Sequence, residues 1–93
     1  MDKLNPLFHQ ELRLSIVSYL MNIEWADFKK LIEITSASKG NLSVQITKLQ
    51  KAGYIEVKKS FKGNYPHTEC CITDLGRKEF TLYLSQLKKM LNL

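Results

Sequence analysis

A helical segment that ends at a glycine and runs into an alternating strand constrains this chain more than any other feature. Ser38 is suited to cap a helix over about residues 38–52, and Asn41 stands where its side chain can reach back toward the cap. Gly53 suits the left-handed residue that follows a helix. Apolar side chains at helical spacing form one stripe that can hold this helix to a body: Leu42, Ile46 and Leu49.

The opposite side of this helix is short, polar and basic apart from one valine. Its centre and flanks carry Gly40, Asn41, Ser43, Val44, Gln45, Thr47, Lys48 and Lys51. Serine, asparagine, glutamine and lysine side chains hydrogen-bond base edges or phosphates from the major groove of DNA, and a valine methyl can contact a thymine methyl. The pattern is typical of a helix that is presented to duplex DNA.

The segment after Gly53, residues 55–73, predicts a basic β-hairpin. Apolar and polar positions alternate from Ile55 to Phe61, so that one face is mostly apolar and the other polar. Residues 62–67 form a turn-rich loop, and residues 68–73 return as the second strand. A basic hairpin tip can lie along a sugar-phosphate backbone or enter a minor groove, and the candidate contacts are Lys59, Lys62, Asn64, Tyr65 and His67.

Charge is concentrated on this helix and hairpin. The 93 residues carry a net charge of +5, and residues 39–62 hold six lysines against the single acid Glu56. Such an excess of positive charge on one surface indicates binding to a polyanion more than a role in solubility. The length fits one domain, residues 1–93, and leaves no room for a second.

The rest of the chain predicts three more helices and a short strand. A first helix is expected to begin near Pro6 or His9 and to end at Asn22, with Arg13 facing solvent. Residues 23–25 alternate like a very short strand, and residues 27–34 follow as a second helix. Thr73 is suited to cap a last helix over about residues 74–92.

The last helix predicts a dimer interface. Four apolar residues are spaced as in a coiled-coil seam, and two more widen the surface: Phe80, Leu84, Leu87 and Leu91, with Tyr83 and Met90. A small monomer needs only one buried stripe, so part of this surface is expected to pack on a second copy. The alternative is a terminal helix that lies across a small core.

Cysteine and histidine usage does not favour an enzyme or a metal site. Cys70 and Cys71 are adjacent, so on a strand one thiol should face the core and the other should face outward, both reduced. With His67 they supply too few well-spaced ligands for a closed metal shell, and an intersubunit disulfide is the minority alternative. Neither His67 nor His9 has a partner of catalytic type in the sequence. We expect no cofactor and no enzyme activity.

Nothing near the N-terminus resembles a signal peptide, and no apolar run reaches the ~20 residues that cross a bilayer. We therefore expect a cytoplasmic protein with no membrane partner.

Motifs along nearly the whole chain resemble the small MarR-like transcriptional regulators. They are Leu4-Asn5-Pro6-Leu7 with Arg13-Leu14-x-Ile16, Gly40-Asn41-Leu42-Ser43, Leu49-x-x-Ala52-Gly53-Tyr54-Ile55, Lys59-x-Phe61-x-Gly63-x-x-Pro66 and Thr73-x-x-Gly76-Arg77. The resemblance implies an α+β, mainly α, winged helix-turn-helix fold: a three-helix core, a β-hairpin wing and a long C-terminal dimerisation helix. Val44 departs from the family pattern, in which a basic or polar residue is common.

The resemblance also implies which residues contact DNA. In the recognition helix they are Ser38, Lys39, Asn41, Ser43, Val44, Gln45 and Lys48, and in the wing they are Lys59, Lys62, Asn64 and Tyr65. The chain is shorter than a full-length MarR protein, so their ligand pocket is not implied and the small-molecule effector is left unspecified.

These observations predict a homodimeric regulator that binds a pseudo-palindromic site on double-stranded DNA. The sequence does not choose between repression and activation, and repression is the simpler of the two. Occlusion of polymerase is the simpler role for a protein with no space for an activating domain. The alternative is a winged-helix module that binds proteins and not DNA, since folds do not dictate functions. The lysine cluster argues against it, because lysine is usually depleted at the centre of protein interfaces.

Overall fold

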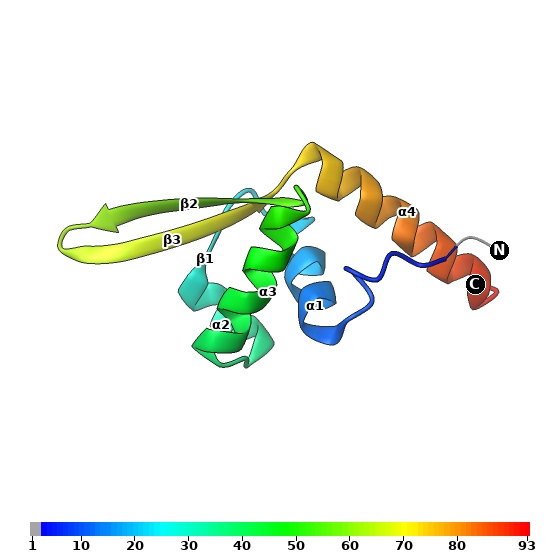
Figure 1. Cartoon of the computed structure of the whole chain (residues 1–93), viewed down its shortest axis with the longest axis horizontal. Coiled ribbons are helices and arrows are strands. Elements are labelled where there is room, and N and C mark those ends of the chain that lie inside the picture. Colours follow the sequence, from blue (N-terminus) through cyan, green and yellow to red (C-terminus); the bar gives the residue numbers. More distant parts are fainter. Residues whose placement is uncertain (1–2) are drawn as a thin grey trace.

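The computed structural model describes residues 3–93, which form four helices and three strands within that range. In chain order they are α1 (Glu11–Leu20), β1 (Ala26–Asp27), α2 (Phe28–Thr35), α3 (Lys39–Lys51), β2 (Ile55–Lys62), β3 (Tyr65–Ile72) and α4 (Asp74–Met90) (Figure 1). The three-helix core, the hairpin and the long last helix are those predicted from the sequence. No helix in the described range combines the length and the apolar character that a membrane crossing needs.

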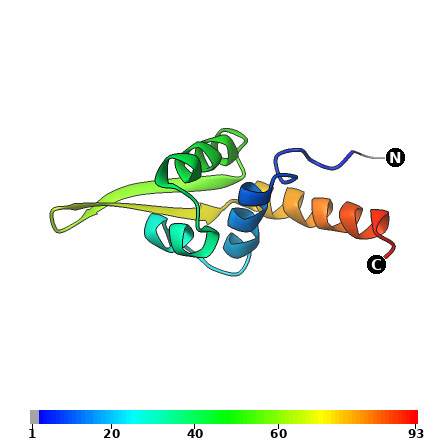
Figure 2. The ribbon, with the colours of Figure 1, turned by 90° about the horizontal axis from the view of Figure 1, so that it is seen from below.

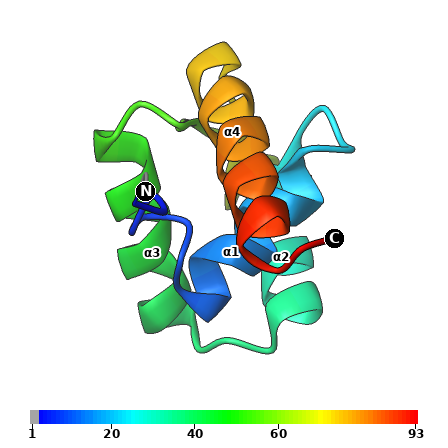
Figure 3. The same ribbon diagram turned by 90° about the vertical axis from the view of Figure 1, so that its right-hand side faces the viewer.

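The molecule is elongated, with principal extents of 51 × 25 × 21 Å. The β2–β3 hairpin projects from one end of the three-helix body and α4 projects from the other (Figures 1 and 2). The sheet is antiparallel in the order β1-β3-β2, and β1 joins it through the pairing of Ala26 with Cys70. Viewed along the long axis, α4 lies in front of α1, with α3 and α2 on either side (Figure 3).

The core lies where the three helices, the base of the hairpin and the start of α4 meet. Phe8 is fully buried at its centre, stacked on Tyr54 at a ring-centroid distance of 5.0 Å and edge-on to Phe80 at 5.1 Å. The predicted stripe of α3 is buried against this core: Leu42, Ile46 and Leu49. Three apolar side chains therefore hold α3 to the body and leave the opposite side of the helix exposed.

Local signals in the sequence define most element ends. Ser38 caps α3 by accepting a hydrogen bond from the backbone N–H of Asn41, and Thr73 caps α4 by accepting one from Gly76 N–H. Gly53 has a φ of +81° directly after α3, as its position predicted. The Thr73 hydroxyl also donates to the Gly53 carbonyl at 2.6 Å, which ties the end of the hairpin to its beginning.

The predicted start of the first helix was wrong. Asn5 does not cap a helix, because its Oδ1 accepts a hydrogen bond from Leu7 N–H and closes a turn. The helix begins at Glu11, where Gln10 accepts from Arg13 N–H, and it ends at Leu20. The short strand is also displaced, since β1 is formed by the two residues that pair with β3, Ala26 and Asp27.

Gly76 lies where the first turn of α4 meets the backbone of Tyr54. A Cβ at this position would overlap the Tyr54 carbonyl group, whereas a Cβ on Gly40, in the first turn of α3, would meet nothing within 4 Å. The close approach of α4 to the end of α3 therefore requires a glycine at position 76.

We expect Gly76→Ala to lower the free energy of unfolding by roughly 2 to 4 kcal/mol, because the clash involves rigid backbone. The matched change Gly40→Ala should be neutral or should stabilise by up to about 1 kcal/mol, as alanine favours a helix. Urea denaturation of both variants measures the difference. Equal stability of the two variants would contradict this account of the contact.

Candidate nucleic-acid interface

The outward surface of α3 is the first part of the candidate site. Most of the residues predicted to contact DNA from this helix are exposed: Ser38, Lys39, Asn41, Ser43, Val44 and Lys48. Val44 has 51% of its surface exposed, although it is apolar. The Ser38 hydroxyl also serves as the helix cap, at 3.1 Å from Asn41 N. The surface is polar and cationic, and no acidic side chain lies within α3.

The prediction that Gln45 contacts DNA was wrong. Its side chain is only 8% exposed. Its Oε1 accepts a hydrogen bond from Arg13 Nη1, and its Nε2 donates to Asn41 Oδ1 at 3.0 Å. The helical pattern placed Gln45 on a flank of α3, and nothing local indicated that α1 covers that flank.

Arg13 was missed as a member of this region, since its position in α1 predicted exposure to solvent. Its guanidinium instead turns toward α3, and Arg13 Nε donates to the carbonyl of Leu7 at 2.7 Å. The only signal in the sequence that could have indicated this contact was an arginine on one helix and polar residues on the flank of another.

The hairpin supplies the second part of the site. The predicted wing residues Lys59, Lys62, Asn64 and Tyr65 are all exposed, and Tyr65 exposes 78% of its surface. Gly63 takes a φ of +63° in the tip, and the register places Lys62 opposite Tyr65. Because the hairpin extends beyond the body (Figure 1), Phe61 is 74% exposed and not part of an apolar face as its alternation predicted.

His67, the other wing candidate, lies deeper than the tip. Its side chain is 17% exposed, and His67 Nε2 lies 3.5 Å from Glu69 Oε1 on the same strand. An imidazole next to a carboxylate is less free to reach a phosphate than the lysines of the tip. The structure therefore favours Lys59 and Lys62 as the cationic contacts of the wing.

An open groove connects the helix to the wing. Lys39 at the start of α3 and Lys62 near the tip line the same hollow, together with Lys29 of α2 and with Tyr65 and His67. Asp27 and Glu33 also border it. A second hollow between α3 and the sheet is lined by Ser43, Thr47, Gln50 and Lys59 among others. Members of both predicted sets thus line the same hollows: Lys39 and Ser43 of the helix, and Lys59, Lys62 and Tyr65 of the wing.

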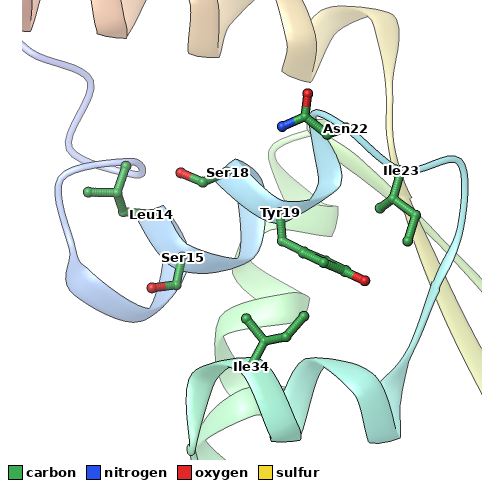
Figure 4. Close-up of a pocket in the computed structure, with 7 residues that line it drawn as sticks. All are labelled: Leu14, Ser15, Ser18, Tyr19, Asn22, Ile23 and Ile34. Carbon is green, nitrogen blue, oxygen red and sulfur yellow. The ribbon is translucent and has the colours of Figure 1, made fainter.

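A separate open hollow lies between α1 and α2 (Figure 4). It is lined by Leu14, Ser15, Ser18, Tyr19, Asn22, Ile23 and Ile34, none of which was predicted to contact DNA. In Figure 4, Ile34 points from α2 toward Tyr19 of α1. This hollow shares no residue with the two that border α3 and the wing.

The last helix uses its predicted apolar surface in two ways. Phe80 and Tyr83 are buried in the core of their own chain, so their assignment to a dimer interface was wrong. They pack on each other at a ring-centroid distance of 5.9 Å. The remaining predicted residues lie farther along α4 and at its C-terminal cap: Leu84, Leu87, Met90 and Leu91. Three of them have exposed fractions of 43 to 56% (Leu84, Met90 and Leu91), and Leu87 is half-buried.

The two cysteines occupy the predicted sides of β3. Cys70 is fully buried and Cys71 is half-buried. Burial raises the pKa of the Cys70 thiol to about 11, with a smaller contribution from Cys71. Burial and the neighbouring Glu56 carboxylate raise the pKa of the Cys71 thiol. Neither thiol is therefore activated as a nucleophile.

The histidines and acids do not form a metal centre in residues 3–93, where no three His, Cys, Asp or Glu side chains gather. His9, which is exposed, has its Nδ1 at 2.9 Å from the Tyr83 hydroxyl and so contributes to the attachment of α4.

Comparison with known proteins identifies the family. Residues 12–91 match the family described as winged helix DNA-binding domain. The chain belongs to this family. The winged-helix chain is also 30% identical, over 84 residues, to an uncharacterized protein of Methanocaldococcus jannaschii; the match covers 90% of this chain and 91% of that protein.

Two solved structures show how closely the winged helix is shared. A transcriptional regulator homologue from Pyrococcus horikoshii OT3 superimposes with a TM-score of 0.87 at 27% identity, over 95% of this chain and 87% of the other. A protein described as a MarR-family transcriptional regulator, from Porphyromonas gingivalis W83, gives 0.70 at 22% identity, over 95% and 86%. The predicted winged helix-turn-helix fold is confirmed, and the likeness to MarR-type regulators is confirmed at the level of the fold.

The burial of the cysteines makes a testable distinction between them. At pH 8 we expect N-ethylmaleimide to label Cys71 slowly and Cys70 at least about tenfold more slowly, because the reagent needs an accessible thiolate. Mass spectrometry of digested protein measures both rates. Cys71→Ser should remove the faster phase, and unfolding in urea should make both thiols react alike. Rapid labelling of Cys70 in the folded protein would show that β3 is not packed as described.

Proposed function

We propose that this winged-helix chain is a sequence-specific regulator of transcription that binds double-stranded DNA as a homodimer and acts as a repressor. The observation that carries the proposal is the exposed surface of α3, which is polar and basic and lies next to a lysine-bearing hairpin. A helix held to the body by one stripe can enter a major groove with its other sides. The family match and the regulator homologue of known structure support this function.

In this proposal the two parts of the interface have different tasks. Lysines on α3 and the wing, among them Lys48 and Lys62, neutralise phosphates and release counterions, which supplies affinity without reading sequence. Asn41 and Val44 carry no charge and offer an amide and two methyl groups to base edges. The groove lined by Lys39 and Lys62 would follow the backbone between them.

The overhang of α4 supports the homodimer. The first half of its apolar stripe is buried through Phe80 and Tyr83, while the second half, in which only Leu87 is half-buried, is largely exposed where α4 projects past the body (Figure 1). This surface comprises Leu84, Leu87, Met90 and Leu91, and below it is called the α4 overhang. An exposed apolar stripe on a helix is suited to pair with its own copy about a two-fold axis. Two copies would then place two α3 helices on successive major grooves of a pseudo-palindromic site.

Repression would follow from occupancy alone. A dimer that covers two half-sites about one helical turn apart excludes polymerase from the same DNA. The wing would lie along the flanking DNA backbone and so would increase the length of DNA that the dimer covers. No catalytic group is needed for this role.

The first test compares two classes of substitution on the full chain. Lys48→Ala and Lys62→Ala should weaken binding to all duplexes alike and should each reduce the salt dependence, since log K falls with log[salt] by about 0.9 per phosphate neutralised. Asn41→Ala and Val44→Ala should leave the salt dependence unchanged and should alter which sequences are preferred. Fluorescence anisotropy with random and selected duplexes measures both effects.

The outcomes separate the alternatives. No affinity of the wild-type chain for any duplex in dilute salt would reject DNA binding and favour a protein-binding adaptor. Equal loss across all sequences for both classes of variant would reject the division between affinity and specificity.

The second test concerns the dimer. Leu84→Glu and Leu91→Glu should each convert the dimer to monomers, because a carboxylate would be buried at the interface. Affinity for a two-half-site duplex should fall roughly tenfold or more as the second contact is lost. Leu82→Glu is the matched control, as Leu82 is 50% exposed and lies about 160° around the helix from Leu84. Sedimentation velocity that shows an intact dimer for Leu84→Glu would place the interface elsewhere.

A further inference from the structure

A line of hydrogen bonds runs from α1 to the outward surface of α3. Arg13 Nη1 donates to Gln45 Oε1, and Gln45 Nε2 donates to Asn41 Oδ1 at 3.0 Å. Arg13 is itself held by the donation of its Nε to the Leu7 carbonyl at 2.7 Å. The middle member, Gln45, is only 8% exposed, whereas Asn41 at the end is exposed. These three side chains are called the Arg13–Gln45–Asn41 relay.

The chemistry of the groups fixes the direction of each amide in the relay. A guanidinium has only donors, so Gln45 must present its oxygen to Arg13. The amide nitrogen of Gln45 then points toward Asn41, and it can only donate there. Asn41 must therefore present its own oxygen to Gln45, which turns its NH₂ group away from the body. No other orientation of the two amides satisfies all three groups.

Packing alone gives no reason for this arrangement. The stripe of Leu42, Ile46 and Leu49 already holds α3 to the body, and an apolar residue at position 45 would add to it. A buried amide has to be hydrogen-bonded on both sides to be tolerated, and here both sides are occupied by the relay. The one consequence that reaches the surface is the orientation of Asn41.

We propose that Arg13 and Gln45 are positioning residues that make Asn41 read DNA as a hydrogen-bond donor. The inference rests on the proposed function, since it assigns a base preference to a residue of the α3 surface. With its NH₂ group outward, Asn41 selects bases that present acceptors in the major groove, such as O6 and N7 of guanine or O4 of thymine. An asparagine whose oxygen also faced the groove would instead pair with adenine through both amide atoms.

The substitution Gln45→Glu reverses the relay without removing it. The new carboxylate can still accept from Arg13 with one oxygen, but its other oxygen cannot donate to Asn41. Asn41 must then turn its NH₂ group inward and present its oxygen to the groove. Selection of bound duplexes from a random pool should show one position change from guanine or thymine to cytosine or adenine, which offer N4 and N6 donors. The ratio of enrichments should change by about fivefold or more.

Gln50→Glu is the matched control, because it makes the same chemical change on the same helix. Gln50 is exposed and lies about 180° around α3 from Asn41, on the flank that borders the sheet. It should weaken binding to all sequences through its charge and should leave the base preference unchanged. Asn41→Asp is a second route to the same switch, since an aspartate presents an acceptor in either orientation. If Gln45→Glu does not fold, an unchanged base preference of Asn41→Asp still overturns the reading role of Asn41.

The free protein provides a readout that does not depend on DNA. In ¹⁵N spectra the side-chain NH₂ protons of Gln45 should exchange with solvent at least about tenfold more slowly than those of Asn41, because only the former are buried and bonded. Arg13→Met should reduce that difference. Unprotected Gln45 protons in the wild-type chain would overturn the relay.

The remaining outcomes distinguish the proposal from the function on which it rests. Binding by Gln45→Glu and Asn41→Asp with the wild-type base preference would overturn the reading role of Asn41 while the proposed function stands. Absence of duplex binding by the wild-type chain, with Gln45 protected, would defeat the proposed function, and the relay would then be structural only.

Discussion

The attachment of α3 by a single apolar stripe is the constraint on which the rest of the structure depends. A helix held by two faces would have few side chains left for a ligand, and a helix with no stripe would not stay in place. Leu42, Ile46 and Leu49 supply the buried apolar surface of α3, and they belong to the same core as Phe8 and as Phe80 of α4. The start of α4 has to pack beside the end of α3, which brings Gly76 into close contact with the backbone of Tyr54.

The predictable parts of the fold were those encoded by local chemistry. The caps at Ser38 and Thr73 and the left-handed Gly53 follow from short-range rules and were found where the sequence placed them. The start of α1 was misplaced because Asn5 and Pro6 favour a turn as much as a helix. Phe61 was misplaced because an alternating pattern does not tell how far a hairpin extends beyond its body.

The candidate site could be predicted only in part, for a related reason. The exposed positions of α3 and the wing follow from periodicity, but the burial of Gln45 depends on Arg13, which is 32 residues away in the sequence. Phe80 and Tyr83, the two aromatic residues of α4 that were assigned to a dimer, belong to the same apolar pattern as Leu84 and Leu91. They are buried because they lie where α4 still contacts the body of its own chain. Both errors concern which surface another element covers, and that depends on tertiary packing.

The elongated shape places the hairpin and the α4 overhang at opposite ends of the molecule (Figures 1 and 2). If the overhang joins two copies, the spacing between half-sites is governed by the length and pitch of one helix, while base choice is governed by another. Insertions or deletions in α4 would then change the spacing between half-sites without changing the preferred bases. Substitutions in α3 would change the preferred bases without changing the spacing. Descendants of such a chain could acquire new target sites by altering one property at a time.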